Sequence, residues 1–376
     1  MSKIIGIDVY SALHSPRGMG IYVINFLKYL AEIDNKNQYI LYGDIADNGN
    51  VLPKQSNFKF KELHARGLLH YEQFVLPKQC KLDKISILHS PANTSPVFLD
   101  KNIKRILTLH DVIFLKKEIP LPYNKKQFLG RLYYALTALL NTKRANIILA
   151  PTEYSKNDIA KTLKIKLNKI LVDSRGHEHF DVHNATNLEE LNNKYNIPAS
   201  FCFCLGGEAP SKNVKLLLET IKKISDKNIV IAGIKNLETS KLYSEYKNYK
   251  NIIFVPYISQ ADIVGLYKNA EFFIFPSLYE GFGLPLLEAM KCRCPIISSN
   301  ATCLPEVAGD AALYFNPRDN KDLLECIKQL HTNRAFLQLL KLKQKERIEC
   351  YSWYNVAKVI LQVYSNILKG EYIEKF

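Results

Sequence analysis

The stretch Ala270–Met290 constrains the fold more than any other part of this chain. Residues Ala270–Pro276 form an apolar run of buried-strand length that ends at a proline. The turn Gly281-Phe282-Gly283 follows, and Pro285 opens a run of good helix formers. A strand, a glycine turn and a helix in this order are typical of a unit of a parallel α/β sheet.

Two glutamates, Glu280 and Glu288, frame this glycine turn. The spacing predicts that Glu280 lies in the loop and Glu288 in the first turn of the helix. Free N–H groups and the positive end of the helix dipole would point into the same volume, so we expect an anion there, most simply a phosphate. The alternative is structural, because acidic residues near a helix start also complement the dipole.

Similar alternations of strand and helix run through the rest of the chain, in two series of comparable size. The first starts with a strand at Lys3–Val9, and the second with Ser200–Gly207, which runs into glycines. We therefore predict an α/β fold of two Rossmann-like domains that face one another across a cleft, with boundaries at 1–185 and 186–352. Further expected elements are a loop at Ser11–Gly20, helices at Ile21–Ile33, Tyr123–Asn146, Asn320–Glu349 and Trp353–Leu368, and a loop with a short strand at Leu304–Asp319.

Charge is distributed unevenly along the chain. The formal net charge is +15, which suggests an anionic partner. Residues 101–170 hold 15 Lys or Arg and 4 Asp or Glu, a local excess of 11 positive charges. The helix expected at Tyr123–Asn146 combines this charge with Tyr, Phe and Leu side chains, which favours an anionic membrane surface as its partner. The alternative is an ordinary domain helix with a solvated basic face.

Other features bound the location and the cofactors. No apolar run approaches the ~18–20 residues that span a bilayer, and the amino terminus is typical of a strand, not of a signal peptide. The eight cysteines lack zinc-ligand spacing and fit reduced thiols. We therefore expect a cytoplasmic protein, peripheral at the inner face of the membrane, with neither a metal nor a bound cofactor.

Candidate site residues also follow other strands. His110 and Asp111 stand at the carboxyl end of a predicted strand, where ligands of open α/β sheets gather. Gly18 and Gly20 follow the first strand of the chain, which fits either a phosphate loop or a plain tight turn. Lys212 and Asn213 stand near the start of a predicted helix in the second series.

These segments resemble a known family. The sequence "SLYEGFGLPLLEAM" matches the E-x7-E motif of retaining glycosyltransferases of the GT-B fold, family four. The resemblance extends over nearly the whole chain and is strongest to bacterial mannosyltransferase-like enzymes of O-antigen and exopolysaccharide synthesis. It is carried further by the segments Ile5–Tyr22, Leu107–Val112, Pro151–Ile159, Pro210–Asn213, Leu304–Asp319 and Ser352–Leu368.

The resemblance implies a role for each matching residue. Glu288 would bind the ribose hydroxyls of a nucleotide, Glu280 the hydroxyls of the donor sugar, and Lys212 the diphosphate. His110 and Asp111 would lie beside the sugar ring, and the helix at 353–376 would cross back onto the first domain. The implied catalytic residues are His110, Asp111, Lys212 and Glu280. The implied donor-binding residues are Gly18, Gly20, Lys212, Asn213, Ser277, Glu280, Gly281, Phe282, Gly283, Leu284 and Glu288.

The chemistry of these residue types agrees with the resemblance. A lysine and a helix amino terminus stabilise the charge that grows on a departing diphosphate, and carboxylates accept strong hydrogen bonds from sugar hydroxyls. No D-x-D pair is present, so no metal-dependent donor site is indicated. The chain departs from the family at Ser211 and Gly207, where members usually carry an arginine, and at Ile21, where an arginine often follows the glycine loop.

The resemblance therefore implies a metal-independent, retaining hexosyltransferase of O-antigen or other lipopolysaccharide and surface-polysaccharide synthesis. It would transfer a sugar, with mannose as the candidate, from a GDP- or UDP-sugar to a lipid-linked oligosaccharide. A non-catalytic scaffold of the same fold is the alternative that the missing arginine motivates. A nucleic-acid-binding protein is motivated by charge alone, without a recognisable motif, so no nucleic-acid partner is expected.

Overall fold

The computed structural model describes residues 3–14, 18–119, 125–224, 226–256 and 258–371. The chain divides into an amino-terminal unit, Met1–His179 with Ser352–Phe376, and a carboxyl-terminal unit, Phe180–Tyr351. The sequence prediction places the corresponding boundaries after residues 185 and 352.

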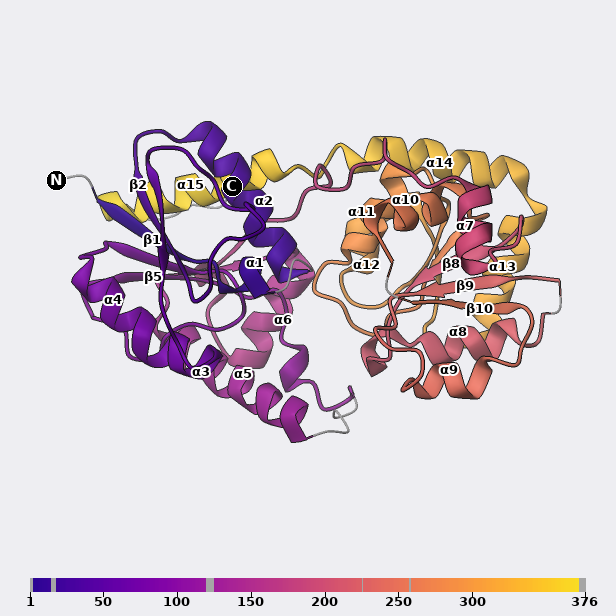
Figure 1. Cartoon of the computed structure of the whole chain (residues 1–376), viewed down its shortest axis with the longest axis horizontal. Helices are drawn as coiled ribbons and strands as arrows, with labels where there is room; N and C mark the ends of the chain where they lie inside the picture. Colours follow the sequence, from indigo (N-terminus) through magenta and orange to yellow (C-terminus); the bar gives the residue numbers. More distant parts are fainter. Residues whose placement is uncertain (1–2, 15–17, 120–124, 225, 257, 372–376) are drawn as a thin grey trace. The chain divides into compact units, whose positions relative to one another are not determined.

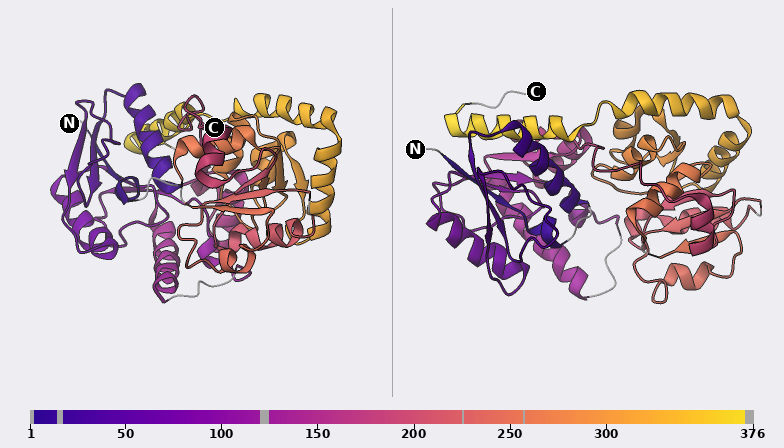
Figure 2. Two further views of the ribbon diagram at one scale, coloured as in Figure 1. Left: turned by 45° about the vertical axis from the view of Figure 1, so that its right-hand side comes forward. Right: turned by 45° about the horizontal axis from the view of Figure 1, so that its top comes forward.

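The amino-terminal unit is built on a seven-stranded parallel sheet in the order β3-β2-β1-β4-β5-β6-β7. Most of its strands are continuous apolar runs because helices cover both faces of the sheet (Figures 1 and 2). The register pairs Ile5 of β1 with Ile87 of β4. The strands are β1 Ile4–Asp8, β2 Gln38–Gly43, β3 Phe58–Glu62, β4 Ile87–Ser90, β5 Lys104–Thr108, β6 Ile147–Ala150 and β7 Ile170–Val172.

The helices of this unit include the last helix of the chain, α15, which packs along α2. Glu178 fixes the start of α15, because its carboxylate accepts hydrogen bonds from Ser352 Oγ at 2.7 Å and from the Trp353 N–H at 3.0 Å. The helices are α1 Tyr10–His14, α2 Met19–Ile33, α3 Leu68–His70, the π-helix η1 Tyr71–Val75, α4 Leu76–Leu82, the 3-10 helix η2 Ile113–Leu115, α5 Lys125–Arg144, α6 Glu153–Leu163, the 3-10 helix η3 Leu167–Lys169 and α15 Trp353–Lys369.

The carboxyl-terminal unit has a six-stranded parallel sheet in the order β10-β9-β8-β11-β12-β13. Its strands are β8 Cys202–Leu205, β9 Ile229–Ala232, β10 Ile252–Val255, β11 Phe273–Phe275, β12 Ile296–Ser299 and β13 Leu313–Phe315. Its helices are α7 Leu188–Tyr195, the 3-10 helix η4 Pro210–Lys212, α8 Val214–Ile221, α9 Lys241–Tyr246, α10 Gln260–Asn269, α11 Leu284–Lys291, α12 Leu304–Ala308, the 3-10 helix η5 Gly309–Ala311, α13 Asn320–Thr332 and α14 Arg334–Ile348.

Three sequence predictions for the bounds of helices and loops were wrong. The helix expected at Asn320–Glu349 is two helices, because Asn333 caps α14 by accepting a hydrogen bond from the Phe336 N–H at 2.9 Å. The loop expected at Leu304–Asp319 contains α12 and η5 before its strand. The loop expected at Ser11–Gly20 contains most of α1, and α2 begins at Met19 rather than Ile21.

The helix expected at Tyr123–Asn146 corresponds to α5, and its first two residues, Tyr123 and Asn124, lie outside the described residues. Residues 15–17 of the expected loop likewise lie outside them. Among the helices of the described ranges, none has the length and apolar composition that a bilayer crossing requires.

Candidate functional site

Two neighbouring strands of the carboxyl-terminal unit, β8 and β11, lead into the loops that carry most of the predicted donor-site residues. Because β8 and β11 are parallel neighbours, both loops leave the same edge of the sheet. The loops are joined directly, since the Leu278 N–H donates to the Ser211 carbonyl at 2.7 Å. This connection brings η4, which holds Lys212, beside the loop that holds Glu280.

Lys212 and Glu280 form an ion pair between these loops. Lys212 Nζ lies 2.6 Å from Glu280 Oε1, with side-chain exposures of 33% and 14%. The backbone of Glu280 is fixed separately, because its N–H donates to Thr302 Oγ1 at 3.2 Å. A partly exposed ammonium group beside a carboxylate can exchange that partner for a ligand phosphate and leave the carboxylate for a ligand hydroxyl.

Glu288 lies deeper than the sequence predicted. It is the fifth residue of α11, so the prediction of the first turn was wrong: the helix begins only at Leu284, after Gly283. The residue is 9% exposed, and its carboxylate accepts a hydrogen bond from the Tyr267 hydroxyl at 3.1 Å. Burial raises the pKa of Glu288 to about 7, and the hydrogen bond from Tyr267 opposes this shift.

The start of α11 leaves its N–H groups without a side-chain cap. Pro285 stands in the first turn, as predicted, and the N-cap residue is Gly283, which has no side chain that could cap the helix. Neither glutamate therefore occupies the N-cap position. Gly283 has φ of +91°, and a Cβ there would lie 2.8 Å from Leu304 Cδ2, so only glycine fits this approach to the helix.

The remaining predicted residues of this unit surround the same turn. Asn213 is structural, because its Nδ2 donates to the carbonyls of Pro276 and Pro317 at 3.1 and 2.8 Å. The Phe282 ring is buried edge-on against Tyr351. The Ser277 hydroxyl is fully buried, and within the described part of the chain it has no hydrogen-bond partner. Gly281 is buried, and Leu284 is the first residue of α11.

The two positions where an arginine is missing differ in the space around them. Ser211 is 7% exposed, and its carbonyl is the acceptor that joins the two loops. A Cβ at Gly207 would lie 3.7 Å from the Gly233 carbonyl oxygen, which is an ordinary contact.

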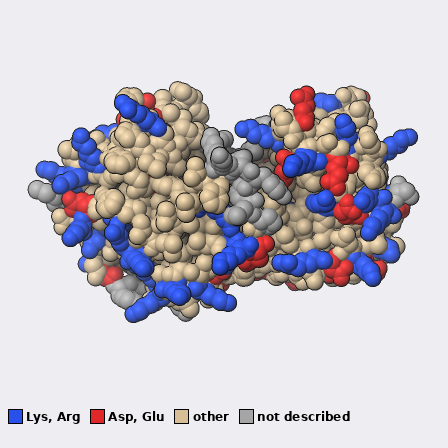
Figure 3. Space-filling model, turned by 90° about the horizontal axis from the view of Figure 1, so that it is seen from below, with Lys and Arg blue, Asp and Glu red and all other residues tan. Residues whose placement is uncertain are grey.

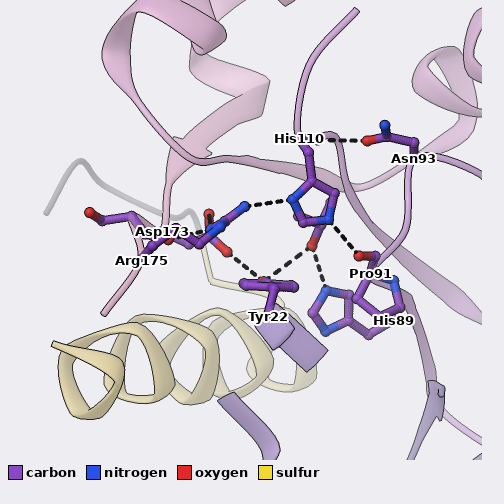
Figure 4. Close-up of polar contacts among 9 residues, drawn as sticks. Tyr22, His89, Pro91, Asn93, His110, Asp173 and Arg175 are labelled. Carbon is purple, nitrogen blue, oxygen red and sulfur yellow. Dashed lines mark hydrogen bonds and ion pairs between the residues drawn. The ribbon is translucent and has the colours of Figure 1, made fainter. Parts of the chain in front are cut away.

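In the amino-terminal unit, His110 is the centre of a polar cluster (Figure 4). Its Nδ1 lies 2.9 Å from Arg175 Nη2, and its Nε2 lies 2.9 Å from the Pro91 carbonyl oxygen. Because a guanidinium group only donates, Nδ1 must accept and the ring proton must be on Nε2, donating to Pro91. Burial and the charge of Arg175 lower the pKa of His110 to about 3, so the ring is neutral.

Sequence reasoning missed the residues that hold His110. Arg175 Nη1 lies 3.0 Å from Asp173 Oδ1, and the Arg175 guanidinium lies 4.1 Å from the centre of the Tyr22 ring. The Tyr22 hydroxyl donates to Asp173 Oδ2. Thr108 Oγ1 lies within hydrogen-bond distance of both the Tyr22 hydroxyl and His89 Nε2. A usable signal was present, because Asp173 and Arg175 directly follow β7, as His110 follows β5.

The other predicted residues of this unit lie around the cluster. Asp111 Oδ1 accepts from the Ile113 N–H at 2.9 Å and so begins η2. Gly18 precedes α2 and Gly20 is buried in its first turn. The Tyr22 N–H donates to the Gly18 carbonyl at 3.1 Å, and the Tyr22 and His110 rings are 5.1 Å apart. The glycine turn is therefore one helical turn from the residue that contacts His110.

A search of the described residues for metal-ligand clusters found no group of three or more His, Cys, Asp or Glu side chains with suitable placement.

Part of the carboxyl-terminal unit is similar to a known protein family. Residues 189–348 match the family described as glycosyl transferases group 1. The serotype-specific mannosyltransferase WbdA of Escherichia coli is 28% identical over 284 residues, which cover 71% of this chain and 34% of WbdA. The O-antigen chain mannosyltransferase RfbU of Salmonella typhimurium is 26% identical over 84% of this chain and 88% of its own length.

The fold prediction is confirmed by solved structures. The crystal structure of HepE from Anabaena in complex with UDP and glucose superposes with a TM-score of 0.71 at 13% identity, covering 97% of this chain and 100% of HepE. The two parallel sheets with their helices are those of the predicted α/β GT-B fold. The chain spans about a third of the length of the WbdA proteins that it matches.

Proposed function

We propose that this chain, in which residues 189–348 match the family described as glycosyl transferases group 1, is a glycosyltransferase that uses a nucleotide-diphosphate sugar. The observation that carries the proposal is the Lys212–Glu280 ion pair on the loops beside α11. Its cation and anion match the two parts of such a donor, an anionic diphosphate and a sugar that carries hydroxyl groups.

Donor binding would exchange one set of charged contacts for another. The diphosphate takes the Lys212 ammonium group, and the uncapped N–H groups of α11 add positive potential at the same place. Glu280, released from Lys212, accepts hydrogen bonds from the donor sugar, and Glu288 accepts them from the ribose. Lys212 then stabilises the charge that grows on the departing diphosphate. Because protein groups supply this charge, we expect transfer to persist in EDTA.

The relatives suggest mannose as the sugar and a lipid-linked saccharide as the acceptor. WbdA and RfbU are mannosyltransferases by name, RfbU one of the O-antigen chain, whereas the HepE structure contains UDP and glucose. We infer a GDP- or UDP-sugar donor, with GDP-mannose the first to test, transfer with retention of configuration as the resemblance implies, and a place in O-antigen or surface-polysaccharide synthesis.

Thermal shift with GDP, UDP, ADP and their sugars tests the nucleotide. Ligand that binds only the folded state stabilises it by about 2.7 kcal/mol at 100 times Kd, so the matching nucleotide should raise Tm measurably. Glu288→Ala should abolish that rise, whereas Glu325→Ala, at an exposed glutamate of the same unit, should not change it. An unchanged response in Glu288→Ala would contradict the role of Glu288.

The same panel separates an enzyme from a scaffold. The absence of the usual arginine at Ser211 and Gly207 motivates the scaffold alternative. Nucleotide binding without transfer or hydrolysis of any nucleotide sugar would favour it, and turnover would exclude it.

We further propose that the amino-terminal unit rests on the cytoplasmic surface of an anionic membrane. Helix α5 exposes an apolar stripe, which we define as Phe128, Leu129, Leu132, Leu136, Leu139 and Leu140. From below, Figure 3 shows an area of this unit largely without charge, bordered by Lys and Arg side chains. An apolar stripe with a basic border is the pattern of interfacial helices. The double variant Leu132→Gln/Leu136→Gln should lose binding to anionic vesicles.

A further inference from the structure

A basic hollow lies at the amino ends of β5, β6 and β7. His110 lies at the opposite edge of the sheet, beyond the carboxyl end of β5. The volume of the hollow is about 620 Å³, and Lys104, Ile147 and Lys169 line it. Lys104 and Ile147 are the first residues of β5 and β6, and Lys169 directly precedes β7. The hollow is therefore separate from the polar cluster of His110.

Five lysines from four segments meet at this hollow. Lys104 comes from β5, Lys143 from the last turn of α5, Lys164 and Lys166 from the turn after α6, and Lys169 from η3. Glu371 is the sole acidic residue that lines it within the described ranges, and that carboxylate lies 3.8 Å from Lys369 Nζ. The lining is strongly positive, which favours an anionic ligand.

A lysine near the carboxyl end of a helix can stabilise the helix dipole, but this role accounts for only part of the lysine cluster. Lys169 Nζ donates to the Lys143 carbonyl at 3.0 Å, so Lys169 does cap the last turn of α5. Burial lowers the pKa of Lys169 below its ordinary value. The exposed Lys104 and Lys166 come from other elements, and placing them here increases the repulsion that an anion would relieve.

The hollow continues the apolar stripe of α5. Leu132, Leu136, Leu139 and Lys143 follow one another at spacings of four, three and four residues, which places them on one face of the helix. The face that exposes leucines along α5 therefore ends at a lysine that lines the hollow. This continuity points to a ligand that is apolar on one side and anionic on the other.

We propose that the hollow binds the phosphate headgroup of an anionic phospholipid while the α5 stripe lies in the acyl boundary of the same leaflet. The inference rests on the membrane association proposed above and names its lipid. Helix α5 runs from the carboxyl edge of the sheet, after β5, to the amino edge, before β6. Its 20 residues span about 30 Å, so a lipid held at its end would align the edge near His110 along the membrane plane.

Co-sedimentation with vesicles tests the lipid site. The pocket variant is Lys104→Gln/Lys166→Gln, and the matched control is Lys36→Gln/Lys59→Gln, which removes the same charge from exposed lysines near β2 and β3. With phosphatidylcholine vesicles that contain phosphatidylglycerol, we expect the pocket variant to bind about tenfold or more weakly than the unmodified protein, and the control less than threefold. Vesicles of phosphatidylcholine alone should bind neither variant.

Lysine acetylation footprints distinguish a lipid from a free phosphate. Anionic vesicles should protect Lys104 and Lys166 from acetylation, whereas inorganic phosphate and glycerol phosphate at millimolar concentration should not. Protection by the free phosphates alone would overturn the lipid assignment, and equal loss of binding in pocket and control variants would reduce the hollow to general surface charge.

Retained vesicle binding in the pocket variant, with loss in Leu132→Gln/Leu136→Gln, would overturn the pocket and leave the membrane proposal standing. Nucleotide thermal shift should be the same in all these variants, so failure of the transferase proposal would show there instead.

Discussion

The polar groups of the two units are held in opposite ways. In the amino-terminal unit, His110, Arg175 and Asp173 belong to a network in which each side chain has protein partners. In the carboxyl-terminal unit, Lys212 and Glu280 form an ion pair between two loops, and the lysine is one-third exposed. The first arrangement is a fixed surface, whereas the second is a pair of charges that can change partners.

This difference separates positioning from charge stabilisation. Both ring nitrogens of His110 already have protein partners, so His110 can offer a ligand its neutral ring but cannot take up a proton without breaking a contact. Lys212 carries a positive charge whose present partner, Glu280, is itself a candidate ligand-binding group. Variants of Lys212 should therefore change the chemistry of transfer, and variants around His110 should change the geometry.

The largest effect is expected for Lys212→Ala. Removing one preformed group that stabilises the leaving charge costs on the order of 10²–10³ in kcat. The Tm should change little, because an ion pair between surface loops contributes only about 1 kcal/mol, even where, as here, it is partly buried. The measurement is kcat and KM with the donor found by thermal shift. Lys215→Ala is the matched control, since Lys215 pairs with an exposed Glu245 in the same unit. If Lys212→Ala and Lys215→Ala had equal kinetics, Lys212 would have no special part in transfer, and the contrast with the His110 cluster would fail.

Arg175 provides the test of the fixed site. Arg175→Lys keeps a positive charge beside Asp173 but loses the planar fork that reaches His110 Nδ1. We expect a tenfold to hundredfold loss of kcat/KM, on the order that misplacement of a positioning group produces. Nitrogen NMR of His110 should show Nδ1 losing its acceptor role and the imidazole pKa rising from about 3.

A control variant guards against a purely structural interpretation of Arg175. Arg347 also donates to backbone carbonyls, in this case in the carboxyl-terminal unit, at Val307 and Glu306. Arg347→Lys should change Tm without changing the His110 signal. An unaltered His110 spectrum in Arg175→Lys would show that Pro91 alone fixes the ring.

The sequence predicted the sheets because most strands are buried on both faces and form continuous apolar runs. It missed β3, an edge strand in which Lys59 and Lys61 interrupt the apolar pattern. It placed one helix across Asn333 because the apolar periodicity continues on both sides of that residue, and the break depends on a local side-chain cap.

For the site, the glutamates and Lys212 were predictable because they stand in one motif or follow a strand end. Arg175 was not predicted as a site residue. It is 65 residues away from His110 in the sequence, and the two meet only because β5, β6 and β7 are neighbours in the sheet. The depth of Glu288 was misjudged for a related reason. Its burial depends on Tyr267 of α10, which the motif does not contain.

The pH dependence of stability and of nucleotide affinity tests Glu288. This residue is buried like His110, but it lies in the same unit as Lys212. Its pKa rises from 4.5 to about 7 on burial, so the folded protein keeps a proton that the unfolded chain releases between these values. The stability of the nucleotide-free protein should therefore fall as pH rises from about 4.5 to 7, by at most about 3 kcal/mol, and stay level above. Nucleotide affinity should change in the opposite direction, because ribose hydroxyls need the ionised carboxylate.

Glu288→Gln should flatten both profiles, since glutamine keeps an acceptor for Tyr267 and does not titrate. Urea unfolding and nucleotide titration between pH 4.5 and 8.5 measure the two slopes. If affinity instead fell together with stability as pH rises, Glu288 would bind its ligand in the protonated form.

The smallest effect is expected for Tyr267→Phe. This variant tests whether the Tyr267 hydroxyl sets the pKa of Glu288 or whether burial alone does so. The Tyr267 hydroxyl lowers the pKa of Glu288, so its removal should move that pKa above about 7. Nucleotide affinity at pH 7 should fall a few-fold and recover by pH 8.5, while stability falls by about 1 kcal/mol for the lost hydrogen bond. Tyr246→Phe is the matched control, because the Tyr246 hydroxyl also donates to a glutamate, Glu219, and it should lose stability without any pH-dependent change in affinity. If nucleotide affinity in Tyr267→Phe stayed low at pH 8.5, the Tyr267 hydroxyl would orient the Glu288 carboxylate in addition to lowering its pKa. Glu288 would then resemble His110, as a group held in place by its neighbours.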